Sequence, residues 1–206
     1  MQWKIALSWI SGYFIFQLFT PILFKFHGAS IAGQMGFTLA AVNAILGLCL
    51  LWPTTKMPEF GKLISAEKWG NLDLLFYKTR KQSIYVYCIL SVIFILFILA
   101  AKEFTSFGER FLSIQDIAPL VLSIFIQIII SNWAMYMRAF KQDPMVYLSV
   151  IGAILTGIST VVLGFFYSST GQVYGYLFLG IFFGIPATYA KFKKFRHSIQ
   201  INQLKN

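Results

Sequence analysis

Long apolar stretches alternate with shorter polar ones along this chain of 206 residues. Crossing the ~30 Å hydrocarbon core of a bilayer takes about 20 helical residues, and each apolar stretch is near that length. The pattern predicts six membrane spans, which run from Ile5 to Phe24, Ala32 to Trp52, Ser83 to Ala101, Ile114 to Tyr136, Met145 to Tyr167 and Gly171 to Ala190.

Within these stretches, apolar and polar residues do not alternate. The third stretch contains "YVYCILSVIFILFILAA", which is apolar on every face, whereas a strand of a membrane barrel alternates over about ten residues. Backbone groups in hydrocarbon have no water to bond, and only a helix satisfies them within one segment. We therefore predict an all-α polytopic membrane protein in which residues 1–206 form a single six-helix lobe.

The composition excludes a water-soluble domain. Hydrophobic residues make up 58% of the chain and charged residues 12%, whereas soluble domains have about 45–50% and about 25%. The first apolar stretch is too long and too aromatic for a signal peptide, and no small-residue cleavage site closes it, so we expect a retained helix. Cys49 and Cys88 fall in predicted spans, where cysteine usually packs as a small hydrophobe.

The positions of the cations predict the orientation of the chain. Cytoplasmic loops of membrane proteins carry an excess of Lys and Arg. If the N-terminus is cytoplasmic, all of the 17 Lys and Arg residues except Lys25, Lys102 and Arg110 lie on the cytoplasmic side. We therefore expect both termini in the cytoplasm. The net charge of +10 is then spread over loops that meet anionic membrane lipids, and we expect no nucleic-acid partner.

The longest polar connection, residues 53–82, lies between the second and third predicted spans and would be cytoplasmic. Its apolar residues interleave with Lys and Glu, and they are Leu63, Ile64, Leu72, Leu75 and Phe76. A short amphipathic helix in the plane of the headgroups would bury this set and leave the charges in water. An ordinary solvated loop is the alternative.

Nothing in the sequence indicates an enzyme. The sequence has no paired-Asp motif of a phosphoalcohol transferase, no H-E-x-x-H, no G-x-S-x-G and no Walker loop. The acidic residues all fall in predicted loops or at span ends, at Glu59, Glu67, Asp73, Glu103, Glu109, Asp116 and Asp143. We expect no catalytic residue, no metal site and no cofactor, so any transport must draw on an ion gradient or on a partner.

Amide side chains stand out among the polar groups inside the predicted spans. They include Gln17, Asn43, Gln127 and Asn132. Such amides can hydrogen-bond between neighbouring helices and hold the bundle together. They can equally line a water-filled cavity, which would make these four residues candidate substrate contacts. Both interpretations stay open.

Glycines recur in the last two predicted spans. They include Gly152, Gly157 and Gly164 in the fifth and Gly175, Gly180 and Gly184 in the sixth. Small residues let membrane helices approach closely, and they also allow bending. The pattern predicts close packing of these helices, with a hinge as the alternative.

A series of short motifs resembles a known family of transporters. The series is "FTPILF", the hairpin "GASIAGQMG", then "WPTTKMPEF", "LDLLFYKTRKQS", the basic elbow "YMRAFKQDP" and a basic tail. Its order resembles the polysaccharide flippases, of the O-antigen and capsule type, in the multidrug/oligosaccharidyl-lipid/polysaccharide exporter superfamily. The resemblance runs along most of the chain and is strongest to the C-terminal six-helix lobe.

This resemblance implies a function in the cell envelope of a bacterium. Members of the family have two six-helix lobes around a cavity that opens alternately to each leaflet of the cytoplasmic membrane. They carry a lipid-linked oligosaccharide, a polyprenyl-pyrophosphate glycan, to the outer leaflet for polysaccharide synthesis. This chain would be one lobe, which either pairs with a separately encoded lobe, forms a homodimer or is the product of a truncated gene.

The resemblance also implies contacts with the pyrophosphate. The anion-contact candidates are Lys25, Lys56, Arg138 and Lys141, and each could instead be a topology or headgroup anchor. Flippases of this type place cations inside their cavity, whereas the spans here offer only amides, so either the second lobe supplies the charge or the substrate differs. The alternative to transport is a membrane interaction or scaffold subunit, or an inert remnant.

Overall fold

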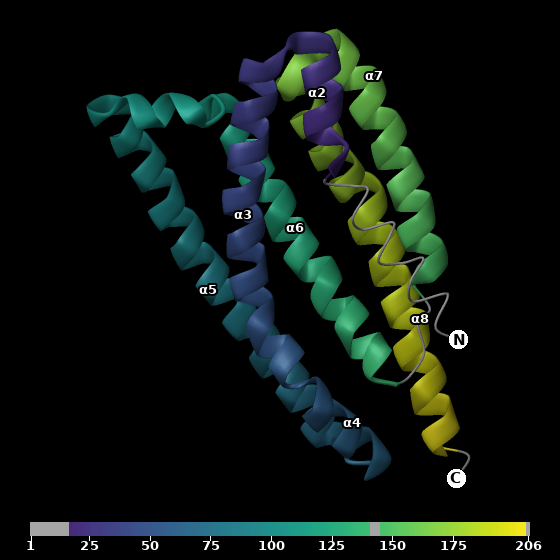
Figure 1. Ribbon diagram of the computed structural model, residues 1–206. Coiled ribbons are helices and arrows are strands. Elements are labelled where there is room, and N and C mark those ends of the chain that lie inside the picture. The colour runs from purple at the N-terminus through teal and green to yellow at the C-terminus, as the bar shows by residue number, and fades with distance from the viewer. Residues whose placement is uncertain (1–16, 141–144, 205–206) are drawn as a thin grey trace.

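The computed structural model describes residues 17–140 and 145–204, and all of the regular structure in these ranges is helical (Figure 1). Most of the predicted first span lies outside the described residues. The elements are α2 (Phe19–His27), α3 (Ala29–Thr55), α4 (Met57–Ser65), α5 (Trp69–Phe104), η1 (Ser106–Arg110), α6 (Ile114–Ala139), α7 (Val146–Leu179), η2 (Gly180–Gly184) and α8 (Ile185–Leu204).

Four helical segments of the described residues are long and apolar enough to cross a membrane. They are Ala29–Ser65, Trp69–Phe104, Ile114–Ala139 and Val146–Ile199. Large apolar side chains cover their outer faces, as Ile89 and Leu96 do on α5 and Phe166 does on α7. A soluble protein rarely exposes apolar patches of this extent. The all-α class predicted from the sequence is therefore confirmed, and the long apolar helices indicate a membrane protein. The six spans and the cytoplasmic termini stay predictions.

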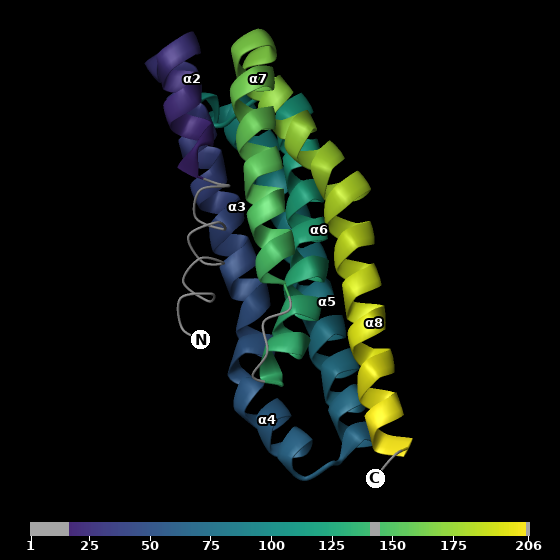
Figure 2. The same cartoon turned by 90° about the vertical axis from the view of Figure 1, so that its right-hand side faces the viewer.

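The segment Val146–Ile199 is not one straight helix. Its backbone leaves the helical region at Ser168, where φ is 57° and ψ is −144°. The chain reverses direction there, so that residues 146–167 and the helix that continues from residue 169 into α8 run antiparallel (Figure 2). We call residues 146–167 and 169–179 the first and second halves of α7.

Glycines allow these two halves to lie very close together. A Cβ atom built on Gly171 would lie 2.3 Å from the carbonyl oxygen of Leu163, and one on Gly175 would lie 2.4 Å from Ser159 Oγ. A Cβ on Gly164 would lie 2.6 Å from the side chain of Gln172. The predicted close packing is thus confirmed at Gly164 and Gly175, and small residues set the distance between the two helices.

The main apolar core lies among α2, α3, α5, α6 and the second half of α7. Phe19, Leu23, Met35 and Leu120 are among its fully buried side chains. Hydroxyl groups tie the helices together around it, because Ser83 Oγ of α5 donates to the carbonyl oxygen of Cys49 in α3 at 2.8 Å. The core therefore holds the helices that carry the polar residues described below.

The predicted interfacial segment 53–82 is helical almost throughout. It contains the end of α3, then α4, a turn with Glu67 at a φ of 55°, and the beginning of α5 at Trp69. Phe60 of α4 is fully buried and belongs to a cluster with Leu72 and Phe76 of α5 and with Met137 of α6. The apolar side of α4 thus packs against protein, and α5 begins at Trp69, well before the predicted start of the third span at Ser83.

α4, the end of α6 and the end of α8 lie at one end of the bundle, while η1 and the α2–α3 turn lie at the other (Figure 1). Arg196 of α8 forms an ion pair with Asp73 of α5, and its Nη1 donates to Tyr77 Oη at 3.1 Å. Burial lowers the pKa of the Arg196 guanidinium, but its hydrogen bond to Tyr77 and the charge of Asp73 raise it more. The guanidinium is protonated in proteins in any case, and its ion pair with Asp73 fastens α8 to α5.

Candidate functional site

A partly open cavity with a volume of about 560 Å³ lies between α6, both halves of α7, η2 and α8, and Leu50 of α3 forms part of its wall. Pockets for small ligands commonly have volumes of about 300–1,000 Å³. Most of the lining consists of Leu, Ile, Met, Ala, Gly and Phe residues. A ligand in this cavity would therefore meet a largely apolar surface.

A strip of polar side chains runs along the α6 wall of the cavity. Ser123, Gln127 and Ser131 all line it, and their spacing of four residues places them on one face of the helix. We call these three residues the α6 polar strip. Thr156 of α7 and Thr188 of α8 add hydroxyl groups to the other walls. The cavity can therefore offer hydrogen bonds along one line and apolar contact elsewhere.

Arg138 continues this strip at the end of α6. It lies seven residues, or about two turns, beyond Ser131 and is the charged member among the described residues that line the cavity. A cation in the last turn of a helix is stabilised by the partial negative charge of the helix C-terminus. The same guanidinium can bind phosphate oxygens through paired hydrogen bonds. The cavity thus has a cationic end, which coincides with the end of the bundle that carries α4.

The sequence candidates separate into residues inside and outside this cavity. Of the four amides, Gln127 lines it, whereas Gln17 is exposed before α2 and Asn43 is half-buried on α3. Asn132 is 1% exposed, and its Nδ2 donates to the carbonyl oxygen of Ile128 at 2.8 Å. Gln127 therefore fits the cavity interpretation. Asn132 is buried away from the cavity, but its hydrogen bond lies within α6 and does not join two helices.

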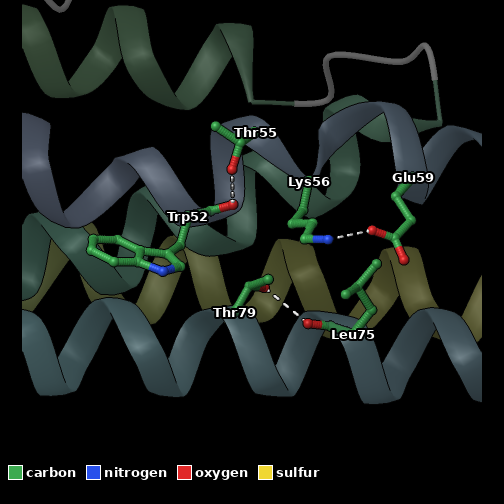
Figure 3. A network of polar contacts seen from close by, with 6 residues as sticks. All are labelled: Trp52, Thr55, Lys56, Glu59, Leu75 and Thr79. Atoms are coloured by element: carbon green, nitrogen blue, oxygen red, sulfur yellow. Dashed lines mark hydrogen bonds and ion pairs between the residues drawn. The ribbon is translucent and has the colours of Figure 1, made fainter.

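The cation candidates separate in the same way. Arg138 lines the cavity. Lys56 is exposed at the α3–α4 junction, where its Nζ pairs with a carboxylate oxygen of Glu59 at 2.8 Å (Figure 3). Lys25 is exposed at the opposite end of the bundle, with its Nζ 5.4 Å from the centre of the Phe26 ring. Lys141 lies outside the described residues.

The π-helix η2 forms another part of the cavity wall and packs directly against α6. A Cβ atom on Gly184 would lie 3.0 Å from Ile130 of α6, and one on Gly180 would lie 3.4 Å from Ile126. Turns of π-helix occur frequently at functional sites. The glycines let η2 approach α6 closely, and they add no polar side chain to this part of the wall.

Sequence reasoning missed part of this cavity. Ser123 and Thr188 were not among its candidates, although both line the cavity. The four-residue spacing of Ser123, Gln127 and Ser131 was the available signal, because it marks one face of the predicted fourth span. Thr188 is contributed by another helix, and only the packing of α8 on α6 brings it to the cavity.

Comparisons of this chain with protein-family models, with curated proteins and with solved structures found no match. An apolar wall, a line of neutral hydrogen-bonding groups and one guanidinium suit an amphiphilic molecule that has an anionic group next to a polar one. The described residues hold no group of three or more His, Cys, Asp and Glu side chains that could bind a metal ion.

Proposed function

We propose that this chain is a six-helix lobe of a transporter that moves a lipid-linked oligosaccharide across the inner membrane of a bacterium for cell-envelope polysaccharide synthesis. The α6 polar strip, which leads to Arg138 inside a largely apolar cavity, is the observation that carries this proposal. A polyprenyl-pyrophosphate glycan combines an apolar chain, an anionic pyrophosphate and neutral sugars. The cavity offers a surface of matching chemistry to each of the three.

Each part of the substrate has a proposed contact. The Arg138 guanidinium would bind the pyrophosphate, because its planar donors match phosphate oxygens. Gln127 and Ser131 would hydrogen-bond to sugar hydroxyls along the α6 polar strip. The polyprenyl chain would lie against apolar side chains such as Leu155 or remain in the surrounding lipid.

The orientation follows from the cations. The proposed lobe has six spans, of which the first is Ile5–Phe24 and the last two are separated by the reversal at Ser168. Both termini, α4 and Arg138 would then lie on the cytoplasmic side, as the excess of Lys and Arg indicates. A substrate made in the cytoplasmic leaflet would meet Arg138 first.

A second lobe would complete the transporter. The cavity is partly open, so this lobe supplies only part of an enclosure around a bulky glycan. A separately encoded six-helix lobe or a second copy of this chain would close the open side. The two lobes could then move relative to each other and expose the cavity to one leaflet at a time.

Labelling with a water-soluble maleimide tests whether the cavity is accessible to water. In a background with Cys49→Ala and Cys88→Ala, we expect Gln127→Cys to react in inside-out membrane vesicles, because Gln127 lines the cavity. Asn132→Cys is the matched control, since it replaces an amide of the same helix that is 1% exposed. We expect this variant to react only after denaturation.

Failure of Gln127→Cys to react in native membranes would contradict the transport proposal. Equal reaction at Gln127→Cys and Asn132→Cys would also contradict it, because the two positions would then share one environment. A scaffold subunit, the alternative function, would give no reaction at either position, since both amides would be held in contacts between helices.

A further inference from the structure

Arg80 of α5 is a half-buried cation that rests on an aromatic ring of another helix. Its guanidinium carbon lies 5.4 Å from the centre of the Trp133 ring of α6. Trp133 is 6% exposed and stacks on Phe192 of α8, with 5.9 Å between the ring centres. Both rings belong to the apolar cluster that also contains Phe60 of α4. Arg80 is therefore held where α5, α6 and α8 meet, at the end of the bundle that carries α4.

The guanidinium of Arg80 has no hydrogen-bond or ion-pair partner among the described residues. Two other half-buried cations have one, since Lys102 Nζ donates to the carbonyl oxygen of Leu112 at 2.6 Å and Arg196 pairs with Asp73. Asp73 precedes Arg80 by about two turns of α5, but Arg196 already neutralises it. Contact with the face of a ring uses none of the five N–H donors of a guanidinium. These donors of Arg80 therefore remain for a ligand.

The predicted spans place this contact at the edge of the hydrocarbon. Arg80 precedes the predicted third span by three residues, or about 4.5 Å of helix. Trp133 lies three residues before the end of the predicted fourth span, and Tyr189 lies one residue before the end of the sixth. The Tyr189 ring of α8 is 5.6 Å from that of Trp133, and both residue types concentrate at the membrane interface. The predictions agree for all three helices, and they place Arg80 at the level of the lipid headgroups.

The surroundings of Arg80 are cationic and reach the surface of the bundle. Lys78 and Lys81 are its neighbours on α5, and both are exposed. Tyr85 of α5 is 58% exposed and Tyr189 of α8 is 52% exposed, so aromatic side chains of both helices meet the surrounding lipid. Lys and Arg side chains at this depth attract anionic lipids. Because the same cations repel the ammonium group of a zwitterionic lipid, they favour a headgroup with a net negative charge.

We propose that Arg80 binds the phosphate of an anionic phospholipid of the surrounding bilayer, at the place where α5, α6 and α8 meet. The planar donors of a guanidinium match two phosphate oxygens, and its weak hydration suits the edge of the hydrocarbon. The acyl chains would lie on exposed apolar side chains of the neighbouring segments, such as Ile89 of α5 and Phe182 of η2. A free phosphate would contact the cation alone, whereas a phospholipid also covers this apolar surface.

A phospholipid bound here would strengthen the packing of α8 beside α5. The ion pair between Arg196 and Asp73 already joins these helices. A headgroup on Arg80 would add a second connection about two turns further along α5. Arg80 and Trp133 do not line the cavity of about 560 Å³. Binding of the phospholipid therefore does not rest on the proposed transport function, and its test needs no glycan.

Thermal unfolding of the purified full chain in mixed micelles tests this site. At about 100 times its Kd, phosphatidylglycerol should raise the unfolding temperature by about 5 °C relative to the same amount of phosphatidylcholine, because the lipid binds the folded chain. Arg80→Gln should abolish this difference and lower the affinity for phosphatidylglycerol by about tenfold or more. Lys81→Gln is the matched control, since it removes an exposed cation at the next position of α5, and it should keep most of the difference.

A second variant covers the case in which Arg80→Gln does not fold. Arg80→Lys keeps the charge and an apolar stem but lacks the planar pair of donors, so its affinity for phosphatidylglycerol should be several-fold lower than that of the wild type. An unchanged affinity in Arg80→Lys would overturn the inference, and so would an equal response of the wild type to the two lipids. Equal losses in Arg80→Gln and Lys81→Gln would also overturn it, because they would show general attraction to anionic lipid. Inorganic phosphate that stabilises the wild type as much as phosphatidylglycerol does would assign the site to free phosphate instead.

Discussion

Replacing Arg138 with Gln is expected to lower the export of lipid-linked glycan by about tenfold or more. Hydrogen bonds to a charged group are worth about 1.5–3 kcal/mol, and about 1.4 kcal/mol corresponds to a factor of ten in binding. Arg138 is the charged residue among those that line the cavity, so no neighbour in the described wall can replace it. The measurement is the rate at which the glycan reaches the outer leaflet in cells with equal amounts of each variant.

Two controls separate substrate binding from anchoring. Lys62→Gln also removes a cation from the proposed cytoplasmic end, but Lys62 is exposed on α4 and does not line the cavity. If Arg138 served only as a topology anchor, both variants would have similar effects. Arg138→Lys should recover part of the activity, because an ammonium supplies the charge without the planar pair of donors. Full activity of Arg138→Gln would contradict a role of this residue in the substrate site.

Gly171→Ala is expected to destabilise the protein by about 3 kcal/mol, because overpacking a close contact costs that much when the backbone cannot yield. The added methyl group would lie 2.3 Å from the carbonyl oxygen of Leu163, 2.9 Å from its carbonyl carbon and 2.7 Å from Tyr167 Cβ. Two of these neighbours are backbone atoms, so the two halves of α7 would have to separate. Thermal unfolding in detergent should show a decrease of about 6 °C or more.

Gly47→Ala is the matched control for this substitution. Gly47 lies inside α3, and no heavy atom lies within 4 Å of the position that its Cβ would take. Because Ala has the higher helix propensity, we expect this variant to be as stable as the wild type or slightly more stable. Equal stability of Gly171→Ala and Gly47→Ala would show that the two halves of α7 are not in the close contact described above.

The sequence predicted the membrane class well, because lipid imposes a simple rule on composition. A helix that faces lipid must be apolar along the part that crosses the membrane. The mean hydropathy of α5 is therefore high, whichever helices pack against it. The beginning of α5 was harder to place. Residues 69–82 carry several cations and resemble a loop. Leu72 and Phe76 pack against α4 and α6, and this packing keeps residues 69–82 helical.

The amides of the predicted fourth span show where composition alone was insufficient. Gln127 and Asn132 are similar side chains in one helix, yet Gln127 lines the cavity and Asn132 is buried among helices. Five residues correspond to a rotation of about 140° around an α-helix, so the two side chains point in different directions. This difference could have been predicted from their spacing, whereas the helix that each one meets could not.

Asp116 illustrates a feature that no local pattern contains. It occurs near the end of an apolar stretch, where an acidic residue is usually solvated or caps a helix. Its burial depends on Ser169, which lies 53 positions later and follows the reversal at Ser168. Such a contact depends on the way in which helices fold back on one another, and the order of apolar and polar residues does not specify it.

The most direct test of the proposed function is protection of Gln127→Cys from maleimide by the substrate itself. In membranes that contain this variant, a polyprenyl-pyrophosphate oligosaccharide should slow the labelling several-fold, because the sugars and the reagent would compete for the α6 polar strip. An anionic phospholipid at the same concentration should leave the rate unchanged. If the oligosaccharide lipid leaves the rate unchanged as well, this cavity does not bind the proposed substrate.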